Sequence, residues 1–495
     1  MTASPGALDH LVSAAQVHGR IPDALRGGRM LSNGPGWTAI HGWTVHPFDG
    51  HGYLRSLALT EEGGVELRAR FVETRVYRDE REAQRMVHRG LASNVGPRFW
   101  QNLGFGAPRN VANTTIIRRG QTLLAGWEGG APHALDAETL ETLGEATFGG
   151  TIEGQATLAH MHLDAAADRL LLCSVKNGPK VTLTFREFDG EDRLSSTREA
   201  MVKGPIFTHD FAFTPSWYVV GGNPLRFRVP ELVKTLVGAS TLLRSLEPKA
   251  DAPGEIHLIP RRGGGPVRTV RLPGPAFVIH FGNAFERDGA VFLDVCAFSS
   301  FEFGEELGYT GPTTPFDPAL PDRRAPQRLY RVEIPANSDQ ASWRPLVPHG
   351  VDFPRIHPRG EGTEVAVLYG ACRRDPRYSD PFDSIIRVDL RDPEAPPQLW
   401  SPPGTVFVGE PLFVPESADP RSVAGHVIAI VSDGERRESR LVILDAAAID
   451  AGPVAWAPLP LLPVAFHGDW DSADALANRR DLVALARDHV GQGVG

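Results

Sequence analysis

Short runs of strand-forming residues, each closed by turn residues, follow one another along most of this chain. The runs are rich in Val, Ile, Leu, Phe and Tyr and are bounded by Gly, Pro, Asp or Asn, as strands usually are. Asp-Gly pairs at 189–190, 288–289 and 433–434 lie between apolar runs, which is a strong hairpin signal. Examples of the predicted strands are Arg169–Lys176, Val181–Phe188, Trp217–Val220, Glu255–Pro260, Val267–Leu272, Ala290–Phe298, Arg328–Ile334, Glu364–Leu368, Ser384–Leu390, His426–Val431 and Arg440–Leu444. The pattern predicts an all-β protein built from antiparallel hairpins.

Helical patterns are few, and they cover Ala7–His18, Asp79–Gly90, Pro230–Leu246 and the tail Ser472–His489. So many hairpins with so little helix favour a closed or radial architecture, because closure removes exposed sheet edges. At 495 residues the chain is too long for one sandwich. We therefore expect a single β-propeller domain over residues 1–495, with an N-terminal helix or arm at 1–20 and a helical insertion at 224–249. No sequence repeat gives the number of blades.

Composition excludes several classes of protein. The 60 acidic against 51 basic residues give a net charge of -9, which argues against a nucleic-acid binder. Three cysteines, Cys173, Cys296 and Cys372, form no close pair, so we expect neither a disulfide framework nor a cysteine metal site, and a cytoplasmic location. The first residues lack a basic region followed by an apolar run, and no stretch is apolar enough to span a bilayer, so we expect no signal peptide or membrane span.

Four of the 17 histidines stand at predicted strand edges beside small or apolar residues: His160, His209, His280 and His467. Their spacing is far too wide for a zinc finger, but ligands from distant blades could meet on a propeller axis. Imidazole suits Fe, Zn, Cu and Ni alike, so the residues alone do not name a metal. On residue chemistry this is a weak signal of a metal centre.

A set of motifs in a fixed order strengthens that signal. Together they resemble the carotenoid cleavage oxygenase family, which includes the retinoid isomerase of the retinal pigment epithelium and bacterial stilbene-cleaving enzymes. The resemblance runs from about residue 20 to the C-terminus. The segments that carry it are Ser32–Gly36, His46–Gly52, Asn110–Ile116, Leu124–Leu143, Thr208–Phe213, Val351–Ile356, Gly409–Pro415 and Phe466–Gly468. It implies a seven-bladed propeller with one Fe(II) per chain on its axis, and no organic cofactor.

The resemblance also implies roles for individual residues. His160, His209, His280 and His467 would bind the iron. His162 is the local competitor for the first position, and a bulge in the strand would overturn the choice of His160. Three carboxylates would hold the histidines: Glu128, Asp352 and Glu410. Asp352 departs from the family, which has a glutamate there, and it either reaches its histidine directly, reaches it through a water, or leaves that ligand less rigid. Thr114 matches a residue that places a methyl group near the open side of the iron, and is otherwise a plain strand threonine.

The implied reaction is the cleavage of one C=C bond by O2 to give two carbonyl products. Four residues match positions that line the family's substrate tunnel, or are otherwise propeller core: Phe48, Trp127, Phe207 and Ile279. Ile279 departs from the common aromatic residue. Trp127 stands where the stilbene-cleaving relatives carry a lysine that grips a phenolic hydroxyl, so it favours a lipophilic polyene as substrate, a carotenoid or an apocarotenoid.

The insertion carries apolar residues at helical spacing from Leu232 to Leu246. This stripe is either packed on a blade or forms an apolar substrate entrance that contacts a membrane interface at residues 224–246, as in the family. The second alternative adds peripheral membrane association to the cytoplasmic location. Three other functions stay open at this stage: cleavage of a stilbene, hydrolysis as in the retinoid isomerase, and a non-catalytic propeller scaffold. Oligomeric state is not encoded in any motif.

Overall fold

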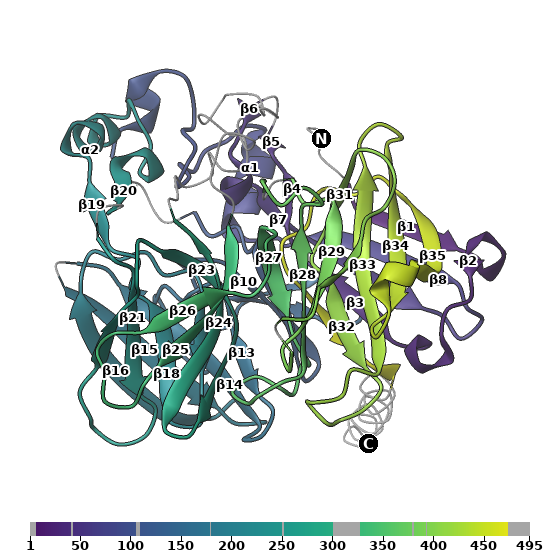
Figure 1. The fold of residues 1–495 in the computed structure, drawn as a ribbon. Coiled ribbons are helices and arrows are strands. Elements are labelled where there is room, and N and C mark those ends of the chain that lie inside the picture. Colours follow the sequence, from purple (N-terminus) through teal and green to yellow (C-terminus); the bar gives the residue numbers. More distant parts are fainter. Residues whose placement is uncertain are drawn as a thin grey trace, which may run out of the picture.

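Seven antiparallel sheets of four to six strands make up most of the described molecule, a computed structural model (Figure 1). It describes residues 6–40, 43–104, 109–178, 180–249, 252–299, 327–378, 381–392 and 394–473. The sheets follow one another along the chain, and inner strands of blades 1 and 2, 4 and 5, 5 and 6, and 7 and 1 contact each other. This is a β-propeller, as the strand pattern predicted, and it has the seven blades that the family resemblance implied. The predicted helix Ser472–His489 lies almost entirely outside the described residues.

Each blade is a sheet that runs from an outer strand to an inner strand at the axis. Blade 1 consists of β1 (Leu8–Val12), β8 (Val65–Phe71), β7 (His51–Leu59), β3 (Arg29–Ser32) and β36 (Gly468–Asp471), with β4 (Pro35–Trp37) paired to β7. Blade 2 consists of β12 (Thr142–Glu145), β11 (His133–Asp136), β10 (Thr122–Gly126) and β9 (Thr115–Arg119). Blade 3 consists of β16 (Leu194–Lys203), β15 (Lys180–Phe188), β14 (Arg169–Lys176) and β13 (His162–Asp164). Blade 4 consists of β22 (Arg268–Arg271), β21 (Glu255–Pro260), β18 (Trp217–Gly221) and β17 (Phe211–Phe213).

The last three blades follow the same plan. Blade 5 consists of β26 (Ser342–Pro345), β25 (Arg328–Ile334), β24 (Ala290–Phe298) and β23 (Phe277–Arg287). Blade 6 consists of β30 (Gln398–Trp400), β29 (Ser384–Asp389), β28 (Val367–Cys372) and β27 (Val351–Arg355). Blade 7 consists of β2 (His18–Gly19), β35 (Pro453–Pro460), β34 (Glu438–Asp445), β33 (Gly425–Asp433) and two short strands that both pair with β33, β31 (Val406–Val408) and β32 (Leu412–Pro415).

The propeller is closed by strands from both ends of the chain. The C-terminal strand β36 pairs with β3 in blade 1, with Arg29 opposite Asp471. These two side chains form a buried ion pair at 2.8 Å, and Arg118 of blade 2 lies 3.0 Å from the same carboxylate. Apolar side chains pack between neighbouring blades, as where Leu57 and Leu67 of blade 1 meet Ile428 and Leu441 of blade 7.

A second layer covers one face of the propeller, at the top of Figure 1. Its helices are α1 (Arg75–Ala83) and α2 (Val229–Leu236), and its small sheets are β5 (Ala39–Ile40) with β6 (Trp43–Thr44) and β19 (Leu225–Phe227) with β20 (Leu246–Pro248). Single 3₁₀ turns lie at Ala14–Gln16, Asp23–Leu25, Pro47–Asp49, Phe99–Asn102, Leu243–Ser245 and Ile449–Ala451. Neither helix is long and apolar enough to cross a bilayer within the described residues.

The predicted strands are confirmed more closely than the predicted helices. Four strands, β14, β21, β24 and β25, have the predicted bounds, whereas β28 begins three residues later than predicted, after a turn around Gly362. The predicted helix Ala7–His18 is wrong: the segment forms β1 and begins β2. Pairing with β8 and β35 at the edges of blades 1 and 7 outweighs its weak helical preference.

The two remaining helices form in shifted or shortened versions. Helix α1 begins earlier than predicted, because the Thr74 side chain caps it by accepting the backbone N–H of Tyr77, and it ends at Gln84 in the left-handed region. Helix α2 ends at Leu236 rather than Leu246, because Gly238 follows with a φ of 77° and turns the chain back. The insertion at 224–249 therefore contains one short helix between the strands β19 and β20.

Candidate metal centre

The four predicted histidines meet on the propeller axis. His160 and His209 stand two residues before the inner strands β13 and β17, His280 lies within β23, and His467 immediately precedes β36. One nitrogen from each ring lies within 4.8 Å of all the others. Residues that are more than 300 positions apart in the sequence are thus neighbours, because every blade sends its inner strand to the same axis.

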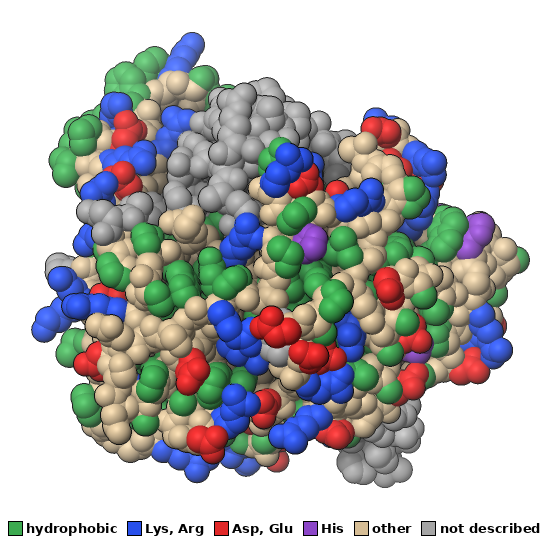
Figure 2. Space-filling view, viewed as in Figure 1, with side chains coloured by type: hydrophobic (Ala, Val, Ile, Leu, Met, Phe, Trp, Pro, Cys, Tyr) green, Lys and Arg blue, Asp and Glu red, His purple; other side chains and the backbone are tan. Residues whose placement is uncertain are grey.

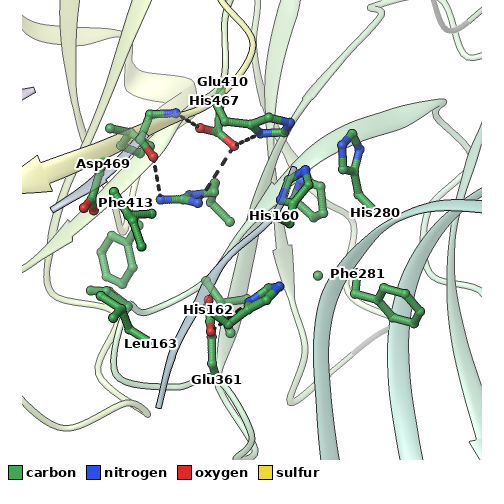
Figure 3. Close-up of a pocket in the computed structure, with 18 of the residues that line it drawn as sticks. His160, His162, Leu163, His280, Phe281, Glu361, Glu410, Phe413, His467 and Asp469 are labelled. Atoms are coloured by element: carbon green, nitrogen blue, oxygen red, sulfur yellow. Dashed lines mark hydrogen bonds and ion pairs between the residues drawn. The ribbon is translucent and has the colours of Figure 1, made fainter. Parts of the chain in front are cut away.

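The four rings surround a common point (Figure 3 shows three of them). The Nε2 atoms of His160 and His209 are 3.3 Å apart, and the ring centre of His467 lies 4.4 Å from that of His160 and 4.9 Å from that of His280. The Nε2 atom of His280 is buried and has no hydrogen-bond partner among the described residues. A buried nitrogen without a partner is costly unless something else satisfies it.

Three carboxylates turn the outer nitrogens of these rings away from the centre. Glu128, in the loop after β10, contacts Nδ1 of His209. Asp352 in β27 lies 2.6 Å from Nδ1 of His280, and Glu410 before β32 lies 2.9 Å from Nδ1 of His467. An ionised carboxylate only accepts hydrogen bonds, so each Nδ1 carries the hydrogen and each Nε2 keeps a free lone pair. This arrangement fixes the tautomer that a metal ion at the centre requires.

Asp352 reaches its histidine directly, which answers one question that the sequence left open. The inner strand β27 departs from regular register between Asp352 and Arg355, and Phe353 adopts a φ of 50°. Such a bulge re-aims the neighbouring side chains toward the axis. The short distance to His280 shows that the missing methylene group of this shorter acid does not prevent contact.

The donor set fits a divalent transition metal. Four imidazole nitrogens bound at about 2.1 Å to one ion would lie at most about 4 Å apart, close to the observed spread of up to 4.8 Å. Imidazole donors suit Fe, Zn, Cu and Ni, and the set carries no charge of its own. Three acidic groups around the histidines supply the negative charge that offsets a cation.

Burial keeps most of these rings in the neutral, ligating form. It lowers the pKa values of His160, His209 and His467 well below 6.5, and the neighbouring imidazoles add to the effect. Burial also opposes the charged form of His280, but the carboxylates of Asp352, Asp210 and Glu410 together outweigh it and raise the pKa of that ring. Because a bound cation competes with protons for the lone pair, metal binding would hold His280 neutral as well.

His162 lies outside the group of four. Its Nε2 is 3.0 Å from Asp210. Its Nδ1 is 3.1 Å from Glu361 (Figure 3), so both ring nitrogens face acceptors. Although burial opposes the charge, these two carboxylates raise the pKa of His162 to about 10. An imidazolium ring has no lone pair to offer a metal. The structure thus separates His160, which points to the centre, from its competitor.

Thr114 lies beside the centre through its backbone. Its carbonyl accepts the backbone N–H of His467 at 3.2 Å, and its hydroxyl donates to Oδ1 of Asn113 at 3.0 Å. Asn113 in turn donates to the carbonyls of Pro47, Phe48 and Gly50. The segment before β9 thereby ties the centre to the loop that carries Phe48.

Three of the four predicted tunnel residues share one apolar cluster. We call it the upper apolar cluster; it consists of Ala92, Leu225, Leu243, Phe277, Ile279 and Phe298, with Phe48, Leu91, Phe207 and Leu246 packed against it. Phe207 and Ile279 stand two residues and one residue before ligand candidates. Trp127 is buried elsewhere, against Val76 and Val111, so the structure does not bring it into this cluster.

A cavity of about 170 Å³ lies next to the histidines on the axis. His160, His280 and His467 line it together with charged residues that the sequence did not single out: Asp210, Arg355, Glu361 and Asp469. Asp210 directly follows His209, so its position was available as a signal. The other three gave none, because they are ordinary charged residues until the blades bring them to the axis.

Comparisons with known proteins decide the family. The model of the family described as retinal pigment epithelial membrane protein matches residues 7–472. The chain is 32% identical over 465 residues to the apocarotenoid-15,15'-oxygenase of Synechocystis, covering 92% of each protein. The chain belongs to the carotenoid cleavage oxygenase family.

Other members of this family are similar over nearly their whole length. Carotenoid cleavage dioxygenase 7 of Oryza sativa is 30% identical, covering 92% of this chain and 87% of the relative, and isoeugenol monooxygenase of Pseudomonas putida is 29% identical, covering 95% and 97%. The solved structure of cobalt-substituted Synechocystis apocarotenoid oxygenase superimposes with a TM-score of 0.86 at 29% identity, covering 95% of this chain and 97% of that one. The carotenoid cleavage oxygenase fold therefore extends over the whole described chain.

Proposed function

We propose that this protein is a non-haem Fe(II) dioxygenase that cleaves one C=C bond of a carotenoid or apocarotenoid to give two carbonyl products. The two oxygen atoms of O2 end up one in each product, so the reaction is balanced without another reductant or cofactor. The observation that carries the proposal is the convergence of His160, His209, His280 and His467, with Nε2 of His280 buried and unsatisfied within the described residues. One Fe(II) per chain would supply the activation of dioxygen.

The side chains of this protein would do the rest. The four histidines hold the metal, and Glu128, Asp352 and Glu410 hold three of the rings in the required tautomer and orientation. No carboxylate lies among the proposed ligands, so the four neutral rings do not balance the charge of the ion. The carboxylates that contact the outer nitrogens of the rings would balance it instead. Thr114 would lie at the open side of the centre, as the family resemblance implies.

The substrate class is inferred from apolar residues and from the relatives. Phe48, Phe207 and Ile279 lie in the upper apolar cluster, which also contains Leu225, Leu243 and Leu246 of the insertion. A polyene has no polar group along its length, so apolar walls can exclude water and present one double bond. The relatives include an apocarotenoid oxygenase and a carotenoid cleavage dioxygenase by name. The family resemblance, rather than the apolar cluster, contributes Trp127: it matches the position at which stilbene-cleaving relatives carry a phenol-binding lysine, which favours the same choice.

An exposed apolar patch supports contact with a membrane interface. It consists of Phe99, Trp100 and Leu103 from one loop and Phe227, Val229, Val233, Leu236 and Val237 around α2, each between 43% and 65% exposed. The two segments form one surface, because Gly104 donates its backbone N–H to Leu236 and Asn102 donates to Gly238. Figure 2 shows hydrophobic side chains over α2 beside basic and acidic ones; Glu231 pairs with Lys234, and Glu247 with Arg226. Such a surface suits the uptake of a lipophilic substrate from an anionic lipid interface.

Metal analysis and a substrate assay test the proposal together. Purified protein should contain about one iron per chain, and incubation with an apocarotenal under O2 should shift the visible absorption to shorter wavelengths as aldehydes form. A protein without metal affinity would refute the proposed centre. Retained iron with cleavage of isoeugenol or a stilbene, but not of polyenes, would keep the centre and refute the substrate class; similarity to isoeugenol monooxygenase makes that comparison necessary.

The membrane contact has a separate test. Replacing Val233 and Leu236 with aspartate changes exposed side chains, so the fold should be retained. Binding to anionic vesicles in a flotation assay should then be lost, while cleavage of a detergent-solubilised apocarotenal should stay near that of the wild type. Equal flotation of the variant and the wild type would refute the role of the patch.

A further inference from the structure

Asp210 is a buried carboxylate beside the axis whose two oxygens contact three different blades. It follows His209, and its side chain is 3% exposed. Its Oδ1 atom accepts the backbone N–H of Phe211 at 2.7 Å and lies 3.0 Å from Nε2 of His162, while Oδ2 accepts the backbone N–H of Phe281 at 2.8 Å. Both oxygens are thus fully engaged, and none of these partners is itself a proposed metal ligand.

Each of these partners belongs to a strand that carries a proposed ligand. Phe211 begins β17 just after His209, His162 begins β13 two residues after His160, and Phe281 follows His280 in β23. One carboxylate therefore connects blades 3, 4 and 5 at the level of their histidines. Without this carboxylate, the inner strands of the three blades could shift relative to one another by a few tenths of an ångström. Shifts of that size change the geometry of a metal site.

His160 is the ligand candidate that lacks a close carboxylate. The Nδ1 atoms of His209, His280 and His467 each contact an acid, whereas Nδ1 of His160 lies 3.7 Å from Oδ1 of Asp210. That separation is too long for a hydrogen bond, but a charge at this distance still orients the N–H dipole in a buried site. Asp210 is therefore the acid that faces the fourth histidine.

His162 and Glu361 hold Asp210 in this role. Nε2 of His162 lies 3.0 Å from Asp210 and Nδ1 lies 3.1 Å from Glu361, so the ring links buried Asp210 to Glu361, whose side chain is 33% exposed. The short motif around His160 and His162 thus supplies a metal ligand and, two residues later, the support for its orienting acid.

We propose that Asp210 is a positioning residue of the metal centre, which sets the orientation of His160 and the spacing of His160, His209 and His280, with the ring of His162 as its side-chain partner. The inference rests on the proposed metal centre. Asp210 would orient His160, as Glu128, Asp352 and Glu410 orient the other three rings. It also gives His162 a function as the side chain that keeps Asp210 in place.

Cobalt titration of the metal-free protein tests this inference without relying on activity. Co(II) absorbs in the visible range, and its spectrum reports the geometry of its ligands. Asp210→Asn, which keeps the volume, should weaken Co(II) binding by about 10–100-fold and alter the spectrum of the bound ion. Asp294→Asn is the matched control: Asp294 is equally buried but pairs with Arg331, and this variant should lower the melting temperature while leaving affinity and spectrum unchanged.

A second variant guards against misfolding of the first. His162→Gln leaves the two backbone contacts of Asp210 intact but removes the imidazole that faces it, and should change the Co(II) spectrum in the same direction with a smaller loss of affinity. Wild-type affinity and spectrum in whichever of the two variants folds would overturn the inference. If the wild-type protein itself binds no Co(II), the proposed metal centre fails first, which is a distinguishable result.

Discussion

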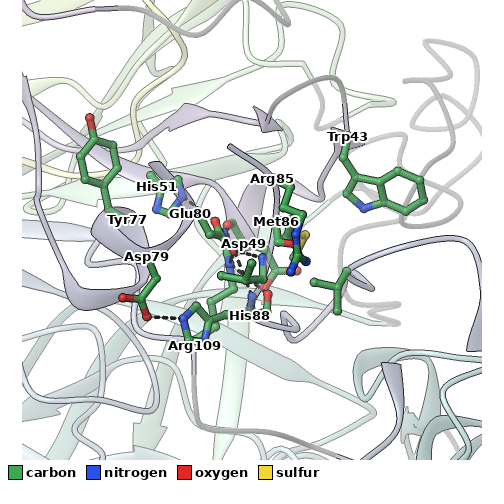
Figure 4. A network of polar contacts seen from close by, with 12 residues as sticks. Trp43, Asp49, His51, Tyr77, Asp79, Glu80, Arg85, Met86, His88 and Arg109 are labelled. Atoms are coloured by element: carbon green, nitrogen blue, oxygen red, sulfur yellow. Dashed lines mark hydrogen bonds and ion pairs between the residues drawn. The ribbon is translucent and has the colours of Figure 1, made fainter. Parts of the chain in front are cut away.

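Two buried histidine–carboxylate groups in this molecule look alike locally and differ in what surrounds them. One is the axial centre, where Asp352 contacts His280. The other lies under α1, where Nε2 of His51 in β7 is 2.8 Å from Glu80 (Figure 4). In both, the second ring nitrogen is buried and has no hydrogen-bond partner within the described residues: Nε2 of His280 and Nδ1 of His51. Burial and a carboxylate partner therefore do not by themselves make a metal site.

The difference lies in what else converges. Glu80 also forms a two-pronged ion pair with Arg109, at 2.5 and 2.9 Å, and accepts the backbone N–H groups of Val87 and His88. His88 turns its own Nε2 to Asp79 instead (Figure 4). Within the described residues, the group under α1 thus satisfies its charges internally and leaves Nδ1 of His51 without a hydrogen-bond partner. At the axis, four nitrogens face one point, and their charge balance calls for a cation.

The largest expected effect contrasts the two histidines directly. His280→Ala removes one of four nitrogen donors, so the purified protein should lose its iron and its cleavage activity should fall below detection. His51→Ala should keep about one iron per folded chain. Metal analysis by mass spectrometry on both variants measures the contrast. Loss of iron from the His51 variant alone would invert the assignment of the two sites.

The next largest effect concerns stability. Glu80→Gln leaves Arg109 buried without its ion-pair partner, and breaking such a pair costs about 3–5 kcal/mol of unfolding free energy. Chemical denaturation should show this loss, while the metal content of the folded fraction stays unchanged. If the variant were as stable as the wild type, the network under α1 would not stabilise the fold as its geometry indicates.

A smaller effect is expected from the acid behind a ligand. Glu410→Gln retains the side-chain volume but loses the carboxylate that accepts from His467 and from the backbone N–H of Gly468. Metal affinity should fall by about 10–100-fold, because such supporting acids fix ring orientation and basicity. Competition with a chelator measures it. The counterpart Glu80→Gln should show no loss of affinity.

The smallest effect is a pH dependence of stability. Burial lowers the pKa of His51 from 6.5 to about 4, so the unfolded chain takes up a proton below pH 6.5 that the folded chain refuses. The contribution of His51 is thus fully present above pH 6.5 and is lost as pH falls toward 4. Between pH 6.5 and 5.5 the wild type should lose about 1 kcal/mol more than His51→Gln. Parallel curves for the two proteins would contradict the shift.

The sequence predicted the ligand candidates better than their surroundings. The order of the motifs identified the four histidines and three acids, and Asp-Gly turns located hairpins, because these signals are local. The number of blades could be predicted only from the family resemblance, because no sequence repeat marks the blades. The sequence did not reveal the positions of Asp210 and Glu361 beside the metal centre, because those positions depend on contacts between blades 3, 4, 5 and 6. The helix expected at Ala7–His18 failed for a related reason: pairing at two blade edges is invisible to local propensity.

Analysis of the products under ¹⁸O2 tests the central claim most directly. Iron-loaded protein incubated with an apocarotenal should yield two shorter carbonyl compounds whose masses sum to that of the substrate plus one dioxygen, with one labelled oxygen in each before exchange with water. An unchanged polyene, a hydrolysed or isomerised product without label, or a single product would contradict the account.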